Sequence, residues 1–147
     1  MLNYKLGYIA SPLHASTKSG IKRNMKRARA YEVALNCISG SRNKAIHGYV
    51  PAVFDDRIQE EREIGLKMGL QLLDISDAII ICGNRITNGM KAELKVAINN
   101  NKLIYVFLGS PSRFKSINTL KFMMGQFSFR KIDKPEAKNI LATRRVY

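Results

Sequence analysis

The sequence contains few of the residues that build disulfide frameworks and metal centres. Its cysteines are Cys37, within a helical pattern, and Cys82, at the end of an apolar strand, and its histidines are His14 and His47. Two isolated cysteines do not form a disulfide framework, and the spacing of these four residues is not that of a zinc site. We therefore predict no metal and no cofactor.

The sequence also lacks any apolar run of the roughly eighteen residues that a membrane-spanning helix requires. The N-terminal stretch MLNYKLGYIASPLHAS has no basic region, long apolar region or cleavage site of a signal peptide. We therefore expect a cytoplasmic protein without a membrane partner.

Acidic residues are scarce. The 147 residues include 25 lysines and arginines but only 11 aspartates and glutamates, so the formal net charge is +14 and the isoelectric point is near 10.1. A surplus of cations raises the local concentration of phosphates and other anions. The charge predicts an anionic partner, but it does not distinguish a long nucleic acid from a small nucleotide.

The length and the apolar content of 46% fit a single domain over residues 1–147. Period-2 and continuous apolar patterns alternate with patterns of helical spacing. The helix at 21–38 has a basic face opposite its apolar face. The helix at 57–73 is expected to direct four side chains toward the core: Ile58, Leu66, Leu70 and Leu73. Expected strands cover 4–11, 45–54, 77–83 and 102–109, and expected helices cover 21–38, 57–73 and 88–99.

This alternation predicts an α/β fold, with a Rossmann-like or flavodoxin-like parallel sheet that has helices on both faces. From about residue 110 we expect a basic C-terminal extension with a helix around 117–124, one more short strand and a basic tail. In such sheets ligands bind beyond the carboxyl ends of the strands. The loops at 10–20, 51–56 and 83–89 should therefore converge at one edge of the sheet.

Glu93 is the most informative residue near that edge. On a helical wheel Met90, Leu94 and Ala97 define the buried face of the helix, and Glu93 falls at its border. Burying a carboxylate there costs free energy unless it is paired with another group or takes part in function. Glu93 should therefore point into the ligand crevice at the edge of the sheet. The alternative is a solvated glutamate that complements the helix dipole.

Glu32 is a similar acidic residue among the apolar positions of the first helix, and pairing with an arginine is its ordinary explanation. Asp55, Asp56 and Glu61 belong to the run DDRIQEEREIG, which reads mostly as solvated helix surface. Asp55 or Asp56 could instead bond a sugar or a base at the edge.

Several stretches resemble the nucleoside 2-deoxyribosyltransferase-like superfamily, in particular a poorly characterised branch found in bacterial and phage genomes. These stretches are YIASPL, an asparagine followed by ARAY, EREIGL, and LLDISDAIIICGNRITNGMKAEL. The resemblance covers about 4–108. It implies a nucleoside or nucleotide ligand, a homo-oligomer and, for a phage-encoded protein, the bacterial cytoplasm as its location.

The resemblance also implies residue roles. Glu93 corresponds to the glutamate that attacks the anomeric carbon of the sugar, and Tyr8 to the aromatic residue that positions it. Asp55 or Asp56 would meet the base as an acid. Asn24 and Asn88 would lie near the sugar or phosphate. Apart from the resemblance, Gly83 and Gly89 would let the backbone pass close to a ligand, although glycines also serve ordinary strand-to-helix turns. The other predicted substrate contacts are Ser11, Pro12 and Met90.

The chemistry fits this spacing. A carboxylate can form a covalent glycosyl intermediate while an acid protonates the departing base, and a helix N-terminus would hold Glu93 ionised. The chain departs from the transferases just before the glutamate, where they carry an acidic residue and a Gly-Thr pair and this sequence reads Thr87-Asn88-Gly89-Met90. Recognition of the sugar hydroxyl is then altered, or catalysis is lost.

Three functional hypotheses follow. The first is cleavage or transfer of an N-glycosidic bond by Glu93. The second is a non-catalytic binder that recognises or sequesters a nucleotide or cyclic nucleotide signal, for example a phage anti-defence protein. The third is a nucleic-acid surface on the basic helix and tail, which is not favoured because no known nucleic-acid motif accompanies it.

Overall fold

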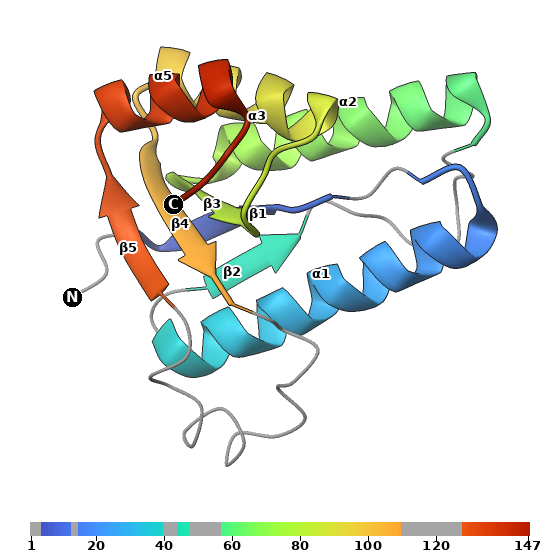
Figure 1. Ribbon diagram of the computed structural model, residues 1–147, viewed down its shortest axis with the longest axis horizontal. Coiled ribbons are helices and arrows are strands. Elements are labelled where there is room, and N and C mark those ends of the chain that lie inside the picture. Colours follow the sequence, from blue (N-terminus) through green and yellow to red (C-terminus); the bar gives the residue numbers. More distant parts are fainter. Residues whose placement is uncertain (1–3, 13–14, 40–43, 48–56, 110–127) are drawn as a thin grey trace.

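The structure is a computed structural model that describes residues 4–12, 15–39, 44–47, 57–109 and 128–147. Strands and helices alternate from β1 to β4, and β5 and α5 follow (Figure 1). The strands are β1 (Leu6–Ala10), β2 (Lys44–His47), β3 (Ala78–Cys82), β4 (Leu103–Leu108) and β5 (Ser128–Ile132). The helices are α1 (Lys18–Ser39), α2 (Gln59–Ile75), α3 (Asn88–Asn99) and α5 (Lys134–Thr143).

The five strands form one sheet in the order β2-β1-β3-β4-β5. β1 pairs in parallel with β2 and β3, and β3 pairs in parallel with β4, whereas β5 runs antiparallel to β4. This strand order is that of flavodoxin-like sheets, and an antiparallel edge strand is a common addition to them. The predicted α/β fold is therefore confirmed, and the predicted parallel sheet needs one correction, at β5.

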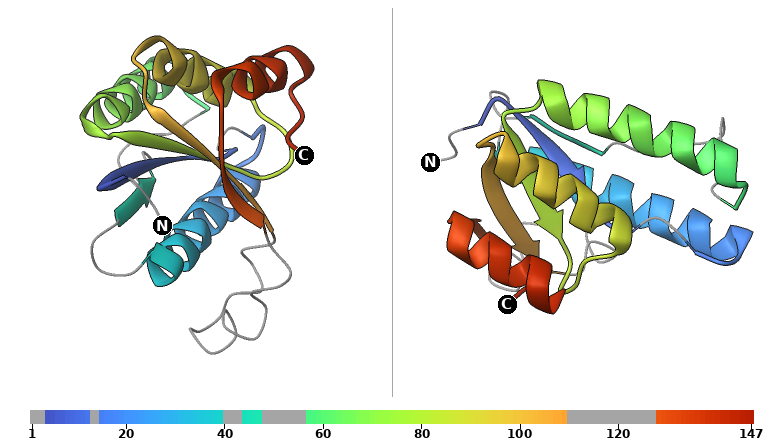
Figure 2. Two further views of the ribbon diagram at one scale, coloured as in Figure 1. Left: turned by 90° about the vertical axis from the view of Figure 1, so that its left-hand side faces the viewer. Right: turned by 90° about the horizontal axis from the view of Figure 1, so that it is seen from above.

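The helices cover both faces of the sheet. α2, α3 and α5 lie on one face and α1 lies on the other (Figure 2). Each face has its own hydrophobic core, and Leu73, Met90 and Leu94 are central to the first. Tyr31 and Leu35 of α1 pack in the second core against Ile80 and Phe107.

β3 is buried at every position because both of its faces are covered. Asp77, the residue before β3, accepts hydrogen bonds from the N–H groups of Lys5 and Leu6, each at 2.8 Å. Burial acts to raise the pKa of Asp77, but these N–H groups outweigh it and hold the pKa below its usual value. The two bonds align the starts of β1 and β3, so the carboxyl ends of both strands reach the same edge.

The predicted range of α3 is confirmed at both ends, and Thr87 caps it by accepting from the N–H of Met90. α1 begins earlier than predicted because the Oγ1 of Thr17 accepts from the N–H of Gly20 at 3.0 Å. Only 45–47 of the predicted strand at 45–54 is described, as part of β2.

The predicted inward face of α2 is partly wrong. Leu73 is buried and Leu70 is partly buried, but Ile58 and Leu66 have exposed fractions of 45% and 42%. The buried line of the helix passes through Gly69 and Leu73. The N-terminal half of α2 extends past the strands (Figure 1), so it has less of the sheet to pack against.

The C-terminal extension contains β5, which confirms the further short strand, and a helix that the sequence analysis missed. Asp133 caps α5 by accepting from the N–H of Glu136, so the predicted basic tail is largely helical. The predicted helix at 117–124 lies outside the described residues. Among the described helices, none is both long and apolar enough to cross a membrane.

Candidate active site

The strand order places the ligand edge between β1 and β3. The chain turns from β1 toward β2 on one side and later returns to β3 on the other, so connections diverge at this point of the sheet. Ala10 at the end of β1 lies opposite Ile81 of β3. Ser11, Pro12 and Gly83, three of the predicted substrate residues, therefore follow neighbouring strand ends at one edge.

Tyr8 and Glu93 form a hydrogen-bonded pair next to this edge. The hydroxyl of Tyr8, on β1, bonds the carboxyl of Glu93, on the second turn of α3. Tyr8 is 4% exposed and packs in the core beneath α2 and α3. The two residues that the sequence analysis assigned to nucleophile and positioning group are thus in contact.

Glu93 is partly exposed as a residue, but its Oε2 atom is buried and has no hydrogen-bond partner in the described part of the chain. Burial raises the pKa of Glu93 to about 7, and the hydrogen bond from Tyr8 acts in the opposite direction. Burial also raises the pKa of Tyr8, with a further contribution from the negative charge of Glu93. Burial therefore acts against the expectation that the helix N-terminus holds Glu93 ionised.

Gly69 of α2 makes room for this pair. A Cβ atom built on Gly69 would lie 2.9 Å from the hydroxyl oxygen of Tyr8, whereas a Cβ on Gly65 would meet no atom within 4 Å. The sequence analysis did not single out Gly69, because its closeness to β1 arises only from packing. Gly69 is a structural requirement of the candidate site.

Glu61 is a second carboxylate that the sequence analysis undervalued. It lies in the first turn of α2, about two helical turns before Gly69. Its Oε2 atom is buried and has no hydrogen-bond partner among the described residues. A fully solvated surface glutamate, as the charge run suggested, would not have a buried oxygen.

The start of α3 offers backbone N–H groups to a ligand. The N–H of Met90 is used in the cap by Thr87, and the side chain of Met90 is 2% exposed and lies in the core. The predicted contact of Met90 with substrate is therefore not supported by this geometry. Asn88 and Gly89 precede it, and their N–H groups are the ones that an α-helix leaves unpaired.

Gly83 is explained by its backbone. Its φ of +100° lies in the left-handed region, where a side chain is strained, and its N–H donates to the carbonyl of Phe107 at 3.1 Å. A Cβ on Gly89 would meet the side chain of Leu66 at 3.7 Å, an ordinary contact distance. The positive φ of the turn therefore explains the glycine at position 83, whereas neither backbone strain nor a close contact explains the glycine at position 89.

The structure does not bring Asn24 together with Glu93. Asn24 lies on α1, which covers the opposite face of the sheet from α3. Asp55 and Asp56 lie outside the described residues. Glu32 pairs with His47, not with an arginine: its Oε2 lies 3.8 Å from Nε2 of His47, and its Oε1 accepts from the backbone N–H of His47 at 3.3 Å.

A family model described as Domain of unknown function (DUF7768) matches residues 5–107. The chain belongs to this family. No curated protein matches the chain. The DUF7768 region contains β1 to β3, all of β4 except its last residue, and both members of the Tyr8–Glu93 pair, while β5 and α5 follow it. The family description states no activity, so the resemblance to the deoxyribosyltransferases stays a prediction.

Proposed function

We propose that this DUF7768 protein binds a nucleoside or nucleotide at the carboxyl edge of β1 and β3 and cleaves or transfers its N-glycosidic bond. The observation that carries the proposal is the buried Tyr8–Glu93 pair, in which Tyr8 bonds the carboxyl group and Oε2 of Glu93 has no hydrogen-bond partner among the described residues. A carboxylate positioned by a neighbouring hydrogen-bond donor can serve as a nucleophile.

In the proposed reaction, an oxygen of ionised Glu93 forms a bond to C1′ of the sugar while the bond from C1′ to the base nitrogen breaks. The base leaves with that bonding pair and takes a proton from an acid. Water or a second base then attacks C1′ and releases Glu93, so the product is a free sugar or a new nucleoside.

The departing base needs a proton donor. Asp55 and Asp56 are the predicted acids, and Glu61 is a further carboxyl group on the described part of α2. The Oε2 atom of Glu61 is buried and has no hydrogen-bond partner among the described residues, and a carboxyl group is one of the side chains that act as a general acid. Glu61 is therefore included as a proposed acid.

The test is base release by the full chain. Purified protein is incubated with a panel of deoxynucleosides, deoxynucleotides and NAD, and free base and exchanged products are measured. Glu93→Gln should lower the rate by at least about a hundredfold, since it removes the nucleophile. Glu60→Gln, at an exposed glutamate of α2, is the matched control and should leave the rate unchanged. Equal rates for the wild type and Glu93→Gln would exclude the nucleophile role.

A non-catalytic nucleotide binder is the second candidate. The observation that favours it is the burial of the Oε2 atom of Glu93, which raises the pKa of the carboxyl group and so disfavours the ionised form that attacks. Intact ligand recovered from the denatured protein after long incubation would support a binder. Release of free base during that incubation would exclude it.

A further inference from the structure

The C-terminal segment, residues 144–146, is hydrogen-bonded to the loop at residues 84–86 that leads into α3. The N–H of Ile86 donates to the carbonyl of Arg144 at 3.1 Å, and the N–H of Val146 donates to the carbonyl of Asn84 at 2.8 Å. Ile86 and Val146 are each 4% exposed and belong to the core beneath α3. The end of the chain is therefore a fixed part of the carboxyl edge of the sheet.

This pairing sets two arginines opposite each other. Arg85 and Arg145 form an antiparallel bridge, and both are exposed. Directly opposed residues of an antiparallel pair carry their side chains on the same side, with Cβ atoms about 4.5–5.5 Å apart. Among the residues that the structure describes, none forms an ion pair or hydrogen bond with either guanidinium group.

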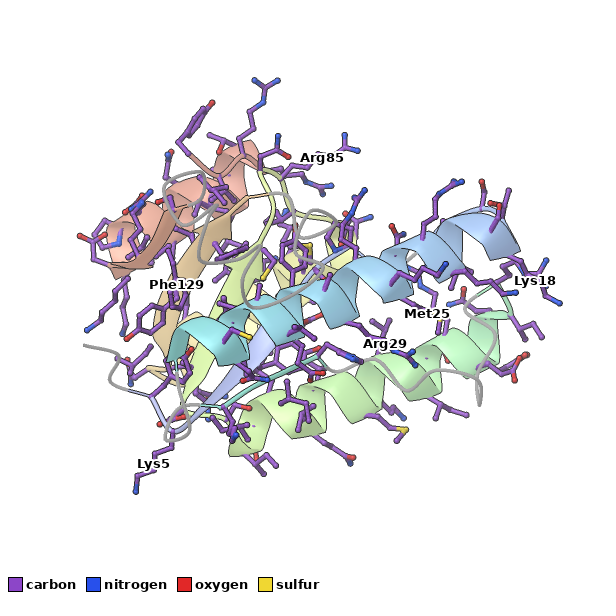
Figure 3. All side chains as sticks on the ribbon, turned by 90° about the horizontal axis from the view of Figure 1, so that it is seen from below. Lys5, Lys18, Met25, Arg29, Arg85 and Phe129 are labelled. Carbon is purple, nitrogen blue, oxygen red and sulfur yellow. The ribbon has the colours of Figure 1, made fainter. Side chains whose placement is uncertain are left out.

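Two opposed cations repel each other, so this pairing costs stability unless an anion lies between them. The loop of Arg85 runs directly into α3, whose first turn contains no acidic residue. The unpaired N–H groups of that turn also favour an anion. In Figure 3, Arg85 lies in the loop beyond the strands, at the opposite end of the sheet from Lys5, which precedes β1.

We propose that Arg85 and Arg145 together bind the phosphate group of a phosphorylated nucleoside. A phosphate accepts paired hydrogen bonds from guanidinium groups, and two arginines on one side of a fixed bridge hold it from two directions. The location of the sugar and base rests on the proposed function, whereas the phosphate contact rests on the arginine pair. Arg145 lies outside the DUF7768 match, so the C-terminal segment adds phosphate selectivity to the family domain.

The experiment measures binding by calorimetry in the Glu93→Gln background, in which the ligand is not consumed. The probes are the four deoxynucleoside 5′-monophosphates and their unphosphorylated nucleosides. We expect one monophosphate to bind at least about tenfold more tightly than its nucleoside. Arg85→Gln and Arg145→Gln should each remove most of that preference and leave nucleoside binding unchanged.

Lys138→Gln is the matched control, since it removes one exposed positive charge from α5 at a place away from the bridge. It should leave the preference intact. An equal loss in Lys138→Gln, an unchanged preference in both arginine variants, or no binding of any monophosphate would each overturn the proposal. A thermal unfolding curve for each variant confirms that it is folded.

A short single-stranded DNA is the remaining probe. If the arginine variants weaken DNA binding but not monophosphate binding, the bridge serves a nucleic acid and the nucleotide proposal is overturned. Base release is scored separately with the wild-type protein. A phosphate preference without base release would refute the proposed enzyme and support the phosphate site. Base release that is unaffected by the arginine variants would support the proposed enzyme and refute the phosphate site.

Discussion

Gly69 and Tyr8 lie so close that no side chain fits between them. A Cβ atom on Gly69 would lie 2.9 Å from the Tyr8 hydroxyl oxygen, closer than a Cβ approaches any neighbour without a shift. The hydroxyl at that contact is the one that bonds Glu93. The packing of α2 on β1 thus sets the position of the candidate catalytic pair.

We expect Gly69→Ala to lower the free energy of unfolding by about 1–3 kcal/mol, because the added methyl group overpacks the site of Tyr8. Gly65→Ala, one turn earlier on the same helix, should raise it by about 0.5–1 kcal/mol, because a Cβ there meets no atom within 4 Å and alanine favours a helix. Urea unfolding of both variants tests this. Stabilisation by both substitutions would contradict the close contact.

Base release should depend on pH through Glu93. Only the ionised carboxylate attacks, so the rate at limiting substrate should rise with pH through about 7, the raised pKa of Glu93, and then level off. Tyr8→Phe removes a hydrogen bond that lowers this pKa, so the midpoint should move to higher pH. The pH–rate profiles of the wild type and Tyr8→Phe test this. An identical midpoint in the two profiles would mean that Tyr8 does not bond the Glu93 carboxylate.

Glu93→Gln should make the protein more stable at alkaline pH. The folded carboxyl keeps its proton to about pH 7, whereas the unfolded one loses it near its ordinary pKa of 4.5, so wild-type stability falls as pH rises between these values and is then constant. The gain from glutamine should reach at most about 3 kcal/mol above pH 7 and vanish at acid pH. Urea unfolding at pH 8.5 and pH 4 measures both limits.

The same comparison tests the burial of Glu93. Equal stability of the wild type and Glu93→Gln at pH 8.5 would show that the carboxylate is solvated in the folded protein. Glu60→Gln, at an exposed position of α2, should show no such dependence on pH.

Glu61→Gln tests the proposed acid. If Glu61 protonates the departing base, its loss should slow release of bases that leave poorly by about 10²–10⁴-fold, the usual contribution of general acid catalysis. Substrates with activated leaving groups should be affected much less, because they depart without a proton. A uniform loss over both kinds of substrate would assign Glu61 to binding, and no loss would remove it from the site.

The sequence predicted more of the central fold than of the ends. The apolar run at 77–83 and the helix at 88–99 carry strong local patterns, and both were confirmed. α5 was missed because its short pattern was read as a basic tail, and the exposure of Ile58 and Leu66 was missed because a helical wheel does not show where the sheet beneath a helix ends.

By itself the sequence determined the βαβ unit and the placement of Glu93 at the border of the buried face of α3, since periodicity, capping by Thr87 and a continuous β-branched strand act locally. The tertiary structure decided that Tyr8 meets Glu93, that Gly69 leaves room for that contact, and that Arg145 lies opposite Arg85. It also decided that the pKa of Glu93 is raised, because desolvation depends on which distant segments cover the carboxyl group. Contacts between segments that are far apart in the chain cannot be predicted from the local periodicity of the sequence.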